Sequence, residues 1–293
     1  MKLTVIIASY RMQREIPRTL MSSLPPCQLG VADLDYEIIV VDNGSPEPLV
    51  LPETESSRAN VKLIRVPTES AEPTPVKCMN EAVLDHASGE YVLICIDGAR
   101  IFSPYLVRRT VDVLDRHPNA FTFVASRHLG SECQMEAVTK GYDQEVEDSL
   151  LDSVDWKTDL DALWGISVWA GCHERNNFLQ QNESNAIGFS RMLWDELGGY
   201  NQGFKKPGGG LCNLELFSRA MNRPNALNVL LLGEATFHQF HGGAATSKMD
   251  YFQEGLEEHI QATGQPYTRQ RFEFLADAGA NYARVQKIGK YLK

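Results

Sequence analysis

Four short, strongly apolar segments rich in β-branched residues recur through the first hundred residues, and they constrain the fold more than any other feature. They are residues 2–9 (KLTVIIAS), 36–45 (YEIIVVDNGS), 61–66 (VKLIRV) and 90–100 (EYVLICIDGAR). Between them, residues 14–24 and 75–87 place apolar side chains at helical spacing. Apolar strands that alternate with helices are typical of a parallel sheet covered on both faces. The sequence therefore predicts an α/β fold with right-handed crossovers.

Charge and cysteine usage restrict the partners and the location. The 293 residues carry a formal net charge of -10, which disfavours nucleic acid or an anionic membrane surface as the main partner. No apolar stretch approaches the roughly 20 residues of a transmembrane helix. The six cysteines form no C-x-x-C pair, and Cys95 lies inside an apolar strand. This pattern favours reduced thiols in a cytoplasmic protein.

Polar side chains follow three of the predicted strands, at the point where each strand ends. Ser9 and Tyr10 follow the first strand, Asp42 and Asn43 the second, and Asp97 the fourth. The carboxyl ends of parallel strands meet at one edge of the sheet, where ligands of α/β proteins bind. A carboxylate there can accept a hydrogen bond from a base N–H or a ribose hydroxyl, although Asp and Asn also form ordinary turns. Taken together, these residues predict a nucleotide site.

The segments TVIIASYRMQREIPRTLMSSL, YEIIVVDNGS and GEYVLICIDGAR resemble the nucleotide half of the GT-A fold glycosyltransferases, particularly the large family two. The resemblance extends more loosely to about residue 245. It implies a mostly parallel, Rossmann-like sheet flanked by helices. It also implies that Asp42 contacts the nucleobase and that Asp97, the first acid of the D-x-D motif, contacts ribose and metal. The second acid, the usual metal ligand, is replaced by Ala99.

A later segment, GGGLCNLELFSRA, stands where inverting members of the family carry their general base. The aligned residue is Asn213, whose amide cannot accept a proton at neutral pH, so Glu215 is the candidate base if the reaction inverts. However, NLEL followed by Arg219 is similar to the retaining polypeptide N-acetylgalactosaminyltransferases, where an asparagine is also found. Retention needs no base. Glu183, in a polar loop before a predicted strand, is a further candidate catalytic residue on the acceptor side.

A cation must offset the charge that grows on the β-phosphate as a nucleoside diphosphate departs. The same retaining enzymes take a metal ligand from a late histidine, and FHQFHGG implies His241 for this role, with His238 as the alternative. One carboxylate and one imidazole would bind Mn²⁺ more readily than Mg²⁺. A route without metal is also open, in which Arg100, Lys205 and Lys206 supply the positive charge. The lysines precede a glycine loop that could close over the donor.

We interpret the chain as a nucleotide-sugar-binding half (residues 1–100), a catalytic and acceptor half (101–248) and a helical C-terminal extension (249–293). The expected activity is transfer of a sugar from a UDP- or GDP-linked donor to a hydroxyl acceptor, and we favour retention. One alternative is a nucleotide-sugar-binding protein that has lost turnover. The other is a nucleotidyltransferase, which should carry a glycine- and arginine-rich loop after its first strand; ASYRMQREIP is not such a loop.

Overall fold

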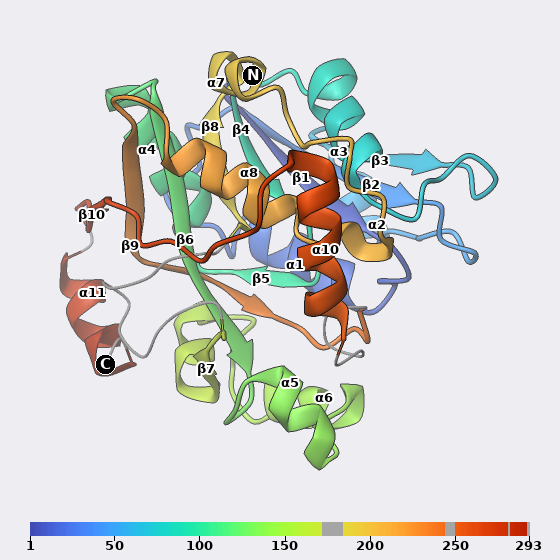
Figure 1. Ribbon diagram of the computed structural model, residues 1–293. Helices are drawn as coiled ribbons and strands as arrows, with labels where there is room; N and C mark the ends of the chain where they lie inside the picture. The colour runs from blue at the N-terminus through green and yellow to red at the C-terminus, as the bar shows by residue number, and fades with distance from the viewer. Residues whose placement is uncertain (172–183, 244–249, 281, 292–293) are drawn as a thin grey trace.

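The computed structural model describes residues 1–171, 184–243, 250–280 and 282–291, and its centre is a ten-stranded sheet (Figure 1). The strands are β1 (Leu3–Ser9), β2 (Tyr36–Asn43), β3 (Val61–Val66), β4 (Tyr91–Cys95), β5 (Arg100–Phe102), β6 (Ala120–Leu129), β7 (Ser167–Trp169), β8 (Ile187–Ser190), β9 (Leu227–His238) and β10 (Leu275–Asp277). The helices are α1 (Glu15–Ser23), α2 (Glu53–Ser56), α3 (Val76–Glu81), α4 (Leu106–Arg116), α5 (Gln134–Ala137), α6 (Gln144–Asp152), α7 (Arg191–Leu197), α8 (Cys212–Met221), α10 (Tyr251–Thr263) and α11 (Tyr282–Ile288).

The sheet is mostly parallel, as the apolar segments predict. Its main path runs in the order β10-β9-β6-β8-β4-β1-β2-β3. Of the described strands on this path, β8 alone runs antiparallel to its neighbours, β4 and β6. The short β5 and β7 pair antiparallel with β9 and β6, off the main path. Residues 1–100, 101–248 and 249–293, the three parts into which we divided the sequence, thus all contribute strands to one continuous sheet.

Alternate residues of β1 face two separate cores, which explains why the strand is apolar throughout. Val5 and Ile7 pack in the core that contains α1 and α4, whereas Ile6 packs in the core that contains α3, α7 and α8. Helices therefore cover both faces of the sheet, and both faces must be apolar. This arrangement leaves the carboxyl ends of the parallel strands as the place where polar side chains gather.

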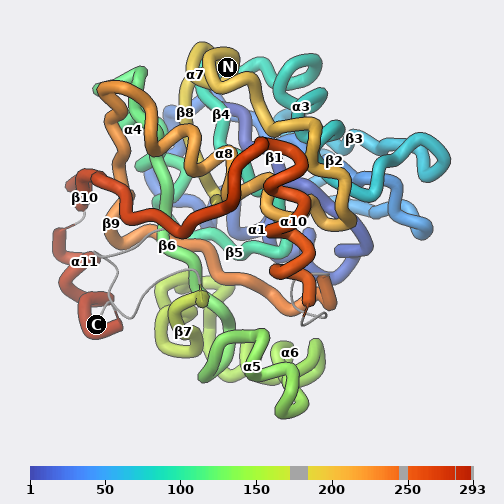
Figure 2. The backbone as a smooth tube through the Cα atoms, in the orientation of Figure 1, coloured from blue at the N-terminus to red at the C-terminus, as the bar shows by residue number. Residues whose placement is uncertain are grey.

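The polar stretch between β6 and β7 folds into a small helical unit. Figures 1 and 2 show α5 and α6 projecting beyond the end of β6, below the rest of the sheet in these views. Trp156 and Trp164 are 2% and 1% exposed. They lie in a third apolar core, which joins this part of the chain to β5, β6 and β9. They anchor the insertion to the sheet, so they are not open faces for stacking on a sugar ring.

The C-terminal segment is helical in α10 and α11, but it also contributes a strand. β10 pairs in parallel with β9, Leu275 opposite Val229, and so extends the sheet at its edge. No helix in the described part of the chain combines the length and apolar character needed to cross a membrane. The five described cysteines are free thiols. The cytoplasmic location stays a prediction.

Candidate functional site

The carboxyl ends of β2, β1 and β4 lie side by side at one rim of the sheet. In the parallel register, Ser9 pairs with Asp42, and Ile7 pairs with Cys95, which closely precedes Asp97. The strand order therefore brings these predicted site residues to the same edge. Their contacts with a nucleotide stay a prediction.

Asp42 organises the loop that follows β2. Asp42 is only 2% exposed. One carboxylate oxygen accepts hydrogen bonds from the hydroxyl of Ser45 at 2.5 Å and from its N–H at 3.3 Å, and the other accepts from the N–H of Leu49 at 3.0 Å. The carboxylate thus shapes the loop that borders the rim, and a direct contact with a base needs this loop to open.

Ser9, Tyr10 and Asn43 differ in how freely they can meet a ligand. The hydroxyl of Ser9 is buried and has no hydrogen-bond partner among the described residues. The Tyr10 ring is 48% exposed, and the Arg11 guanidinium lies 5.3 Å from its centroid. Asn43 instead donates to two carbonyls of the loop before α3, at 3.0 and 3.4 Å. Tyr10 is therefore the predicted residue best placed to add a stacking contact, whereas the Ser9 hydroxyl, like the Asp42 carboxylate, meets a ligand only after a local opening.

Asp97 occupies a tight turn between β4 and β5. Arg100 donates to one oxygen of its carboxylate from Nε at 3.1 Å and from Nη2 at 3.0 Å, while the Ala99 N–H donates to the other at 3.2 Å. The side-chain oxygen of Asn185 accepts the Asp97 N–H at 3.0 Å. Ala99 is fully buried in the core shared with α1. The missing D-x-D acid therefore leaves no hole, because the side chain at position 99 faces the core.

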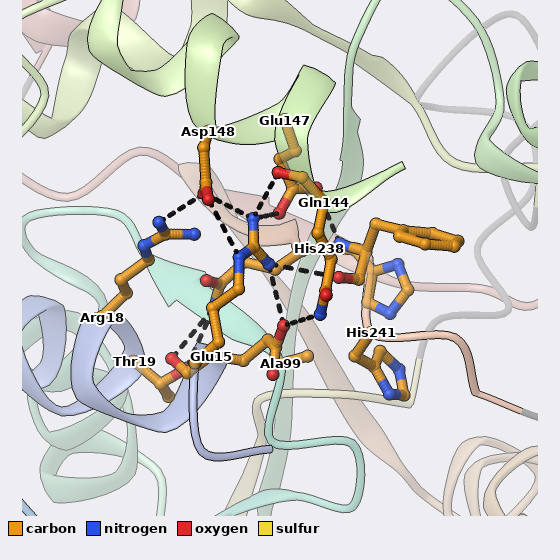
Figure 3. A network of polar contacts seen from close by, with 12 residues as sticks. Glu15, Arg18, Thr19, Ala99, Gln144, Glu147, Asp148, His238 and His241 are labelled. Carbon is orange, nitrogen blue, oxygen red and sulfur yellow. Dashed lines mark hydrogen bonds and ion pairs between the residues drawn. The ribbon is translucent and has the colours of Figure 1, made fainter. Parts of the chain in front are cut away.

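Two histidines complete the site, since β5 pairs antiparallel with the end of β9. This pairing sets Arg100 opposite His238. His238 Nε2 lies 2.9 Å from Asp97 Oδ2, and His241 Nε2 lies 3.5 Å from Asp97 Oδ1. The two imidazole rings lie next to each other, as Figure 3 shows, with centroids 5.3 Å apart. Both candidate histidines thus meet Asp97, with His238 the closer of the two.

The donor set of this cluster fits a divalent cation. One oxygen of Asp97 and one nitrogen each of His238 and His241 lie within 4.8 Å of one another. Neighbouring ligands of an octahedral ion bound at about 2.1 Å are themselves about 3 Å apart. Two imidazoles and one carboxylate suit a transition ion such as Mn²⁺ better than Mg²⁺, which prefers oxygen ligands. The identity of the cation stays a prediction.

The protonation states of His238 and Asp97 are those that a metal requires. Burial and then the charge of Arg100 lower the pKa of His238 to about 4, so the imidazole is neutral at neutral pH. Burial acts to raise the pKa of Asp97, but the electrostatic and hydrogen-bond interactions with its neighbours, the Arg100 guanidinium among them, outweigh burial and hold that pKa well below its ordinary value. A neutral imidazole thus faces an ionised carboxylate, and these are the ligating forms.

A polar network fixes the segment between the two histidines (Figure 3). Glu147, from the insertion, accepts the N–H of Phe240 at 2.7 Å, and Arg14 donates to the Phe240 carbonyl at 3.3 Å. Arg14 also forms ion pairs with Glu15 at 2.8 Å, with Glu147 at 3.1 Å and with Asp148 at 2.6 Å. The backbone that carries His238 and His241 is therefore held by groups from both α1 and α6.

Glu147 is the most perturbed acid of this network. Its side chain is fully buried. Burial raises its pKa to about 7, although Arg14, Tyr142 and the Phe240 N–H favour the charged form. Burial is the largest of these effects and prevails. Glu147 therefore titrates close to neutral pH.

The predicted acceptor-side residues lie in a separate region around α8. The Asn213 amide donates to the Ser184 hydroxyl at 2.7 Å. Glu215 is 7% exposed and bound by Arg219 through two hydrogen bonds of 2.6 and 2.9 Å. It borders a hollow of about 280 Å³ formed by α8, α10 and the chain that follows α10, and this hollow includes none of Asp97, His238 and His241. Glu183 lies outside the described residues. This placement favours a structural ion pair for Glu215.

The side-chain cations considered for a route without metal are already paired. Lys205 forms an ion pair with Glu72 at 3.1 Å, and Lys206 with Glu254 at 2.9 Å. Arg100 is committed to Asp97, as described above. Lys205 and Lys206 would therefore have to leave these ion pairs to serve the side-chain route, whereas Arg100 already lies against Asp97.

Sequence reasoning missed four residues that support the cluster: Arg14, Gln134, Glu147 and Asn185. Arg14 and Glu147 hold the Phe240 peptide, Gln134 hydrogen-bonds His238, and Asn185 holds the Asp97 N–H. Asn185 lies two residues after Glu183 in the same polar stretch of the sequence, which is the only signal that could have found it. Arg14, Gln134 and Glu147 carried no signal, because their partners are remote in the sequence.

No protein family and no curated protein matches the sequence. Solved structures of Staphylococcus aureus TarS are similar to the chain. TarS residues 1–349 in complex with UDP match at 14% identity and a TM-score of 0.50, over 90% of this chain and 67% of that one. The same TarS segment determined in another structure matches at 14% identity and a TM-score of 0.50, over 100% and 70%. A longer TarS chain matches at 15% identity with a TM-score of 0.49, and this protein spans 40% of its length.

The similarity to TarS residues 1–349 concerns the fold. It agrees with the arrangement of the sheet and confirms the predicted α/β fold of the GT-A type, with a mostly parallel sheet flanked by helices. The motifs that resemble the polypeptide N-acetylgalactosaminyltransferases gain no support from these structures.

Proposed function

We propose that the protein is a glycosyltransferase that moves a sugar from a nucleoside diphosphate donor to a hydroxyl acceptor. The observation that carries this proposal is the cluster of Asp97, His238 and His241 at the rim of a parallel sheet. The similarity in fold to TarS, a glycosyltransferase determined with UDP, supports it. UDP is accordingly the first donor nucleotide to test, and GDP the second.

The donor would lie across the carboxyl ends of β2, β1 and β4. Tyr10 offers an exposed ring for the base, and the buried, unpaired hydroxyl of Ser9 would need a local opening to meet a polar group of the donor. Asp42 shapes the loop that borders the base and meets it once that loop opens. Asp97 and the two histidines would hold a divalent cation, preferably Mn²⁺. When bound, this cation offsets the charge that develops on the departing diphosphate.

On the acceptor side, the residues favour a retaining transfer. A general base for inversion must be free to accept a proton within hydrogen-bond reach of the acceptor. Glu215 is instead engaged by Arg219, and Asn213 carries an amide that donates to Ser184. Retention needs no such base, because the departing phosphate can take the acceptor proton. Glu183, which lies outside the described residues, remains a candidate catalytic residue on the acceptor side.

The test is a donor hydrolysis and transfer assay with UDP- and GDP-linked sugars in the presence of Mn²⁺. Donor cleavage that requires Mn²⁺ supports the proposal, and proton NMR of the anomeric centre in fresh product distinguishes retention from inversion. Nucleotide binding in calorimetry without hydrolysis or transfer would instead support a binding protein that has lost turnover. Release of pyrophosphate from a nucleoside triphosphate would indicate a nucleotidyltransferase.

A further inference from the structure

The imidazole of His238 is held at both of its nitrogens. Nε2 lies 2.9 Å from an oxygen of Asp97. Nδ1 forms a short hydrogen bond with the side-chain oxygen of Gln134, the first residue of α5. His238 is 4% exposed and Gln134 is fully buried, so water does not replace either contact. The tautomer of His238 is therefore decided by these two neighbours.

The orientation of the Gln134 amide follows from its other contact. Its side-chain NH₂ donates to the backbone carbonyl of His238 at 3.0 Å, which places the amide oxygen against Nδ1. The backbone N–H of Gln134 in turn donates to Nδ1 of His128 at 3.0 Å and holds the residue in place. An amide oxygen only accepts hydrogen bonds, so this contact favours the tautomer of His238 that carries its proton on Nδ1.

This arrangement opposes the effect of Asp97, whose carboxylate favours a proton on Nε2 of His238. With no partner at Nδ1, a neutral His238 would place its proton on Nε2 and donate it to the nearby carboxylate. A metal would then have to displace that proton, because only a deprotonated nitrogen ligates. Histidines that bind metals commonly donate their second N–H to an oxygen, and loss of that partner costs about 10- to 100-fold in metal affinity.

We propose that Gln134 is a positioning residue of the metal site, which keeps the proton of His238 on Nδ1 and leaves Nε2 free to ligate the cation beside Asp97. The proposal rests on the metal site of the proposed function. It gives the insertion between β6 and β7 a role in assembling that site, since Gln134 reaches it from outside the strands that carry the ligands.

The test begins with the tautomer, which needs no metal. Protein labelled with ¹⁵N-histidine gives long-range proton–nitrogen NMR spectra in which the protonated ring nitrogen is identified, and a His238→Ala spectrum assigns the signal among the seven histidines. Wild-type His238 is expected to carry its proton on Nδ1. Gln134→Leu is expected to move it to Nε2. Gln134→Glu, whose carboxylate still accepts from Nδ1, is expected to keep it on Nδ1.

Calorimetric titration with Mn²⁺ alone provides the second measurement. Gln134→Leu is expected to bind Mn²⁺ about 10- to 100-fold more weakly than wild type, and Gln134→Glu to restore most of the loss. Gln144→Leu is the matched control: this glutamine lies in the same insertion, but its amide donates to Glu15 at 3.0 Å and, among the residues that the structure describes, to no histidine. Its tautomer spectrum and Mn²⁺ affinity should equal those of wild type.

Two results would overturn the role of Gln134. One is a wild-type His238 with its proton on Nε2. The other is a folded Gln134→Leu variant with unchanged tautomer and affinity. If Gln134→Leu fails to fold, the tautomer of His238 in the wild type and in the Gln134→Glu variant still tests the role of Gln134. A wild-type protein with the Nδ1 proton that binds no Mn²⁺ would refute the metal site of the proposed function, and with it the purpose assigned to Gln134.

Discussion

Replacing Glu147 by glutamine should make the protein less sensitive to pH. Glu147 is fully buried, and its pKa is raised from an ordinary value of 4.5 to about 7. Below pH 4.5 both the folded and the unfolded chain hold this proton, so the residue contributes no pH dependence. Between 4.5 and 7 the unfolded chain releases the proton while the folded chain keeps it, and stability falls as pH rises. Above 7 the loss is complete.

The size of this loss follows from the pKa difference. A shift of one pKa unit corresponds to about 1.4 kcal/mol, so the shift of Glu147 from 4.5 to about 7 amounts to roughly 3 kcal/mol. Glu147→Gln removes this pH-dependent loss of stability. Its amide oxygen can still accept the Phe240 N–H, and the difference between this amide and the protonated acid adds an offset that does not depend on pH. The difference in unfolding free energy between variant and wild type should therefore shift in favour of the variant by roughly 2 to 3 kcal/mol from pH 5 to pH 8.

Urea unfolding of both proteins at several pH values measures this difference. Asp148→Asn is the matched control, since the same arginine binds it at 2.6 Å but its pKa is lowered, first by hydrogen bonding to Arg14. Its carboxylate stabilises the fold above its ordinary pKa, and this stabilisation is lost as pH falls, so removal should cost stability at neutral pH. A difference for Glu147→Gln that stays flat or declines from pH 5 to pH 8 would refute the reasoning.

Three further outcomes follow from the geometry. Glu215→Gln should change kcat/KM for transfer by less than about threefold, because Arg219 already engages the carboxylate, whereas loss of a true general base costs about 100-fold or more. Asp42→Ala should lower the free energy of unfolding by about 2 kcal/mol, as measured by urea titration, because it leaves buried donors of the following loop unpaired. Ala99→Asp, which restores the D-x-D acid, should destabilise the fold by several kcal/mol because this side chain faces the core. For the same reason, calorimetry should show no tighter Mn²⁺ binding. Tighter binding by a stable variant would show that position 99 faces the metal.

The strands and the rim of the site were predictable because they depend on local pattern. β-Branched runs mark β1, β2 and β4, and the parallel order then brings Asp42 and Asp97 to one edge. The resemblance to glycosyltransferases directed attention to a late histidine. The pairing of β5 with β9, which sets Arg100 opposite His238, joins remote segments and has no local signal. That resemblance predicted Asp97 with His241, and His238 as the alternative, whereas the structure brings both histidines to Asp97 at once.

The supporting residues could not be predicted because their roles depend on tertiary contacts alone. Gln134 lies in a polar insertion without clear periodicity, and Glu147 resembles any acid of a short surface helix in the sequence. Only the fold buries Glu147 against Arg14 and the Phe240 peptide. The same holds for Ala99: a motif comparison presents it as a missing ligand, whereas the structure turns the side chain into the core.

Binding of Mn²⁺, with and without UDP, to wild type and to Asp97→Asn tests the central claim most directly. Calorimetry should show one Mn²⁺ per wild-type chain and tighter UDP binding when Mn²⁺ is present. Asp97→Asn, confirmed as folded by its thermal transition, should lose Mn²⁺ binding and the effect of Mn²⁺ on UDP, while Asp33→Asn, an exposed acid that pairs with Arg108 at 2.8 Å, should retain both. Equal Mn²⁺ affinity in wild type and a folded Asp97→Asn variant would contradict the account.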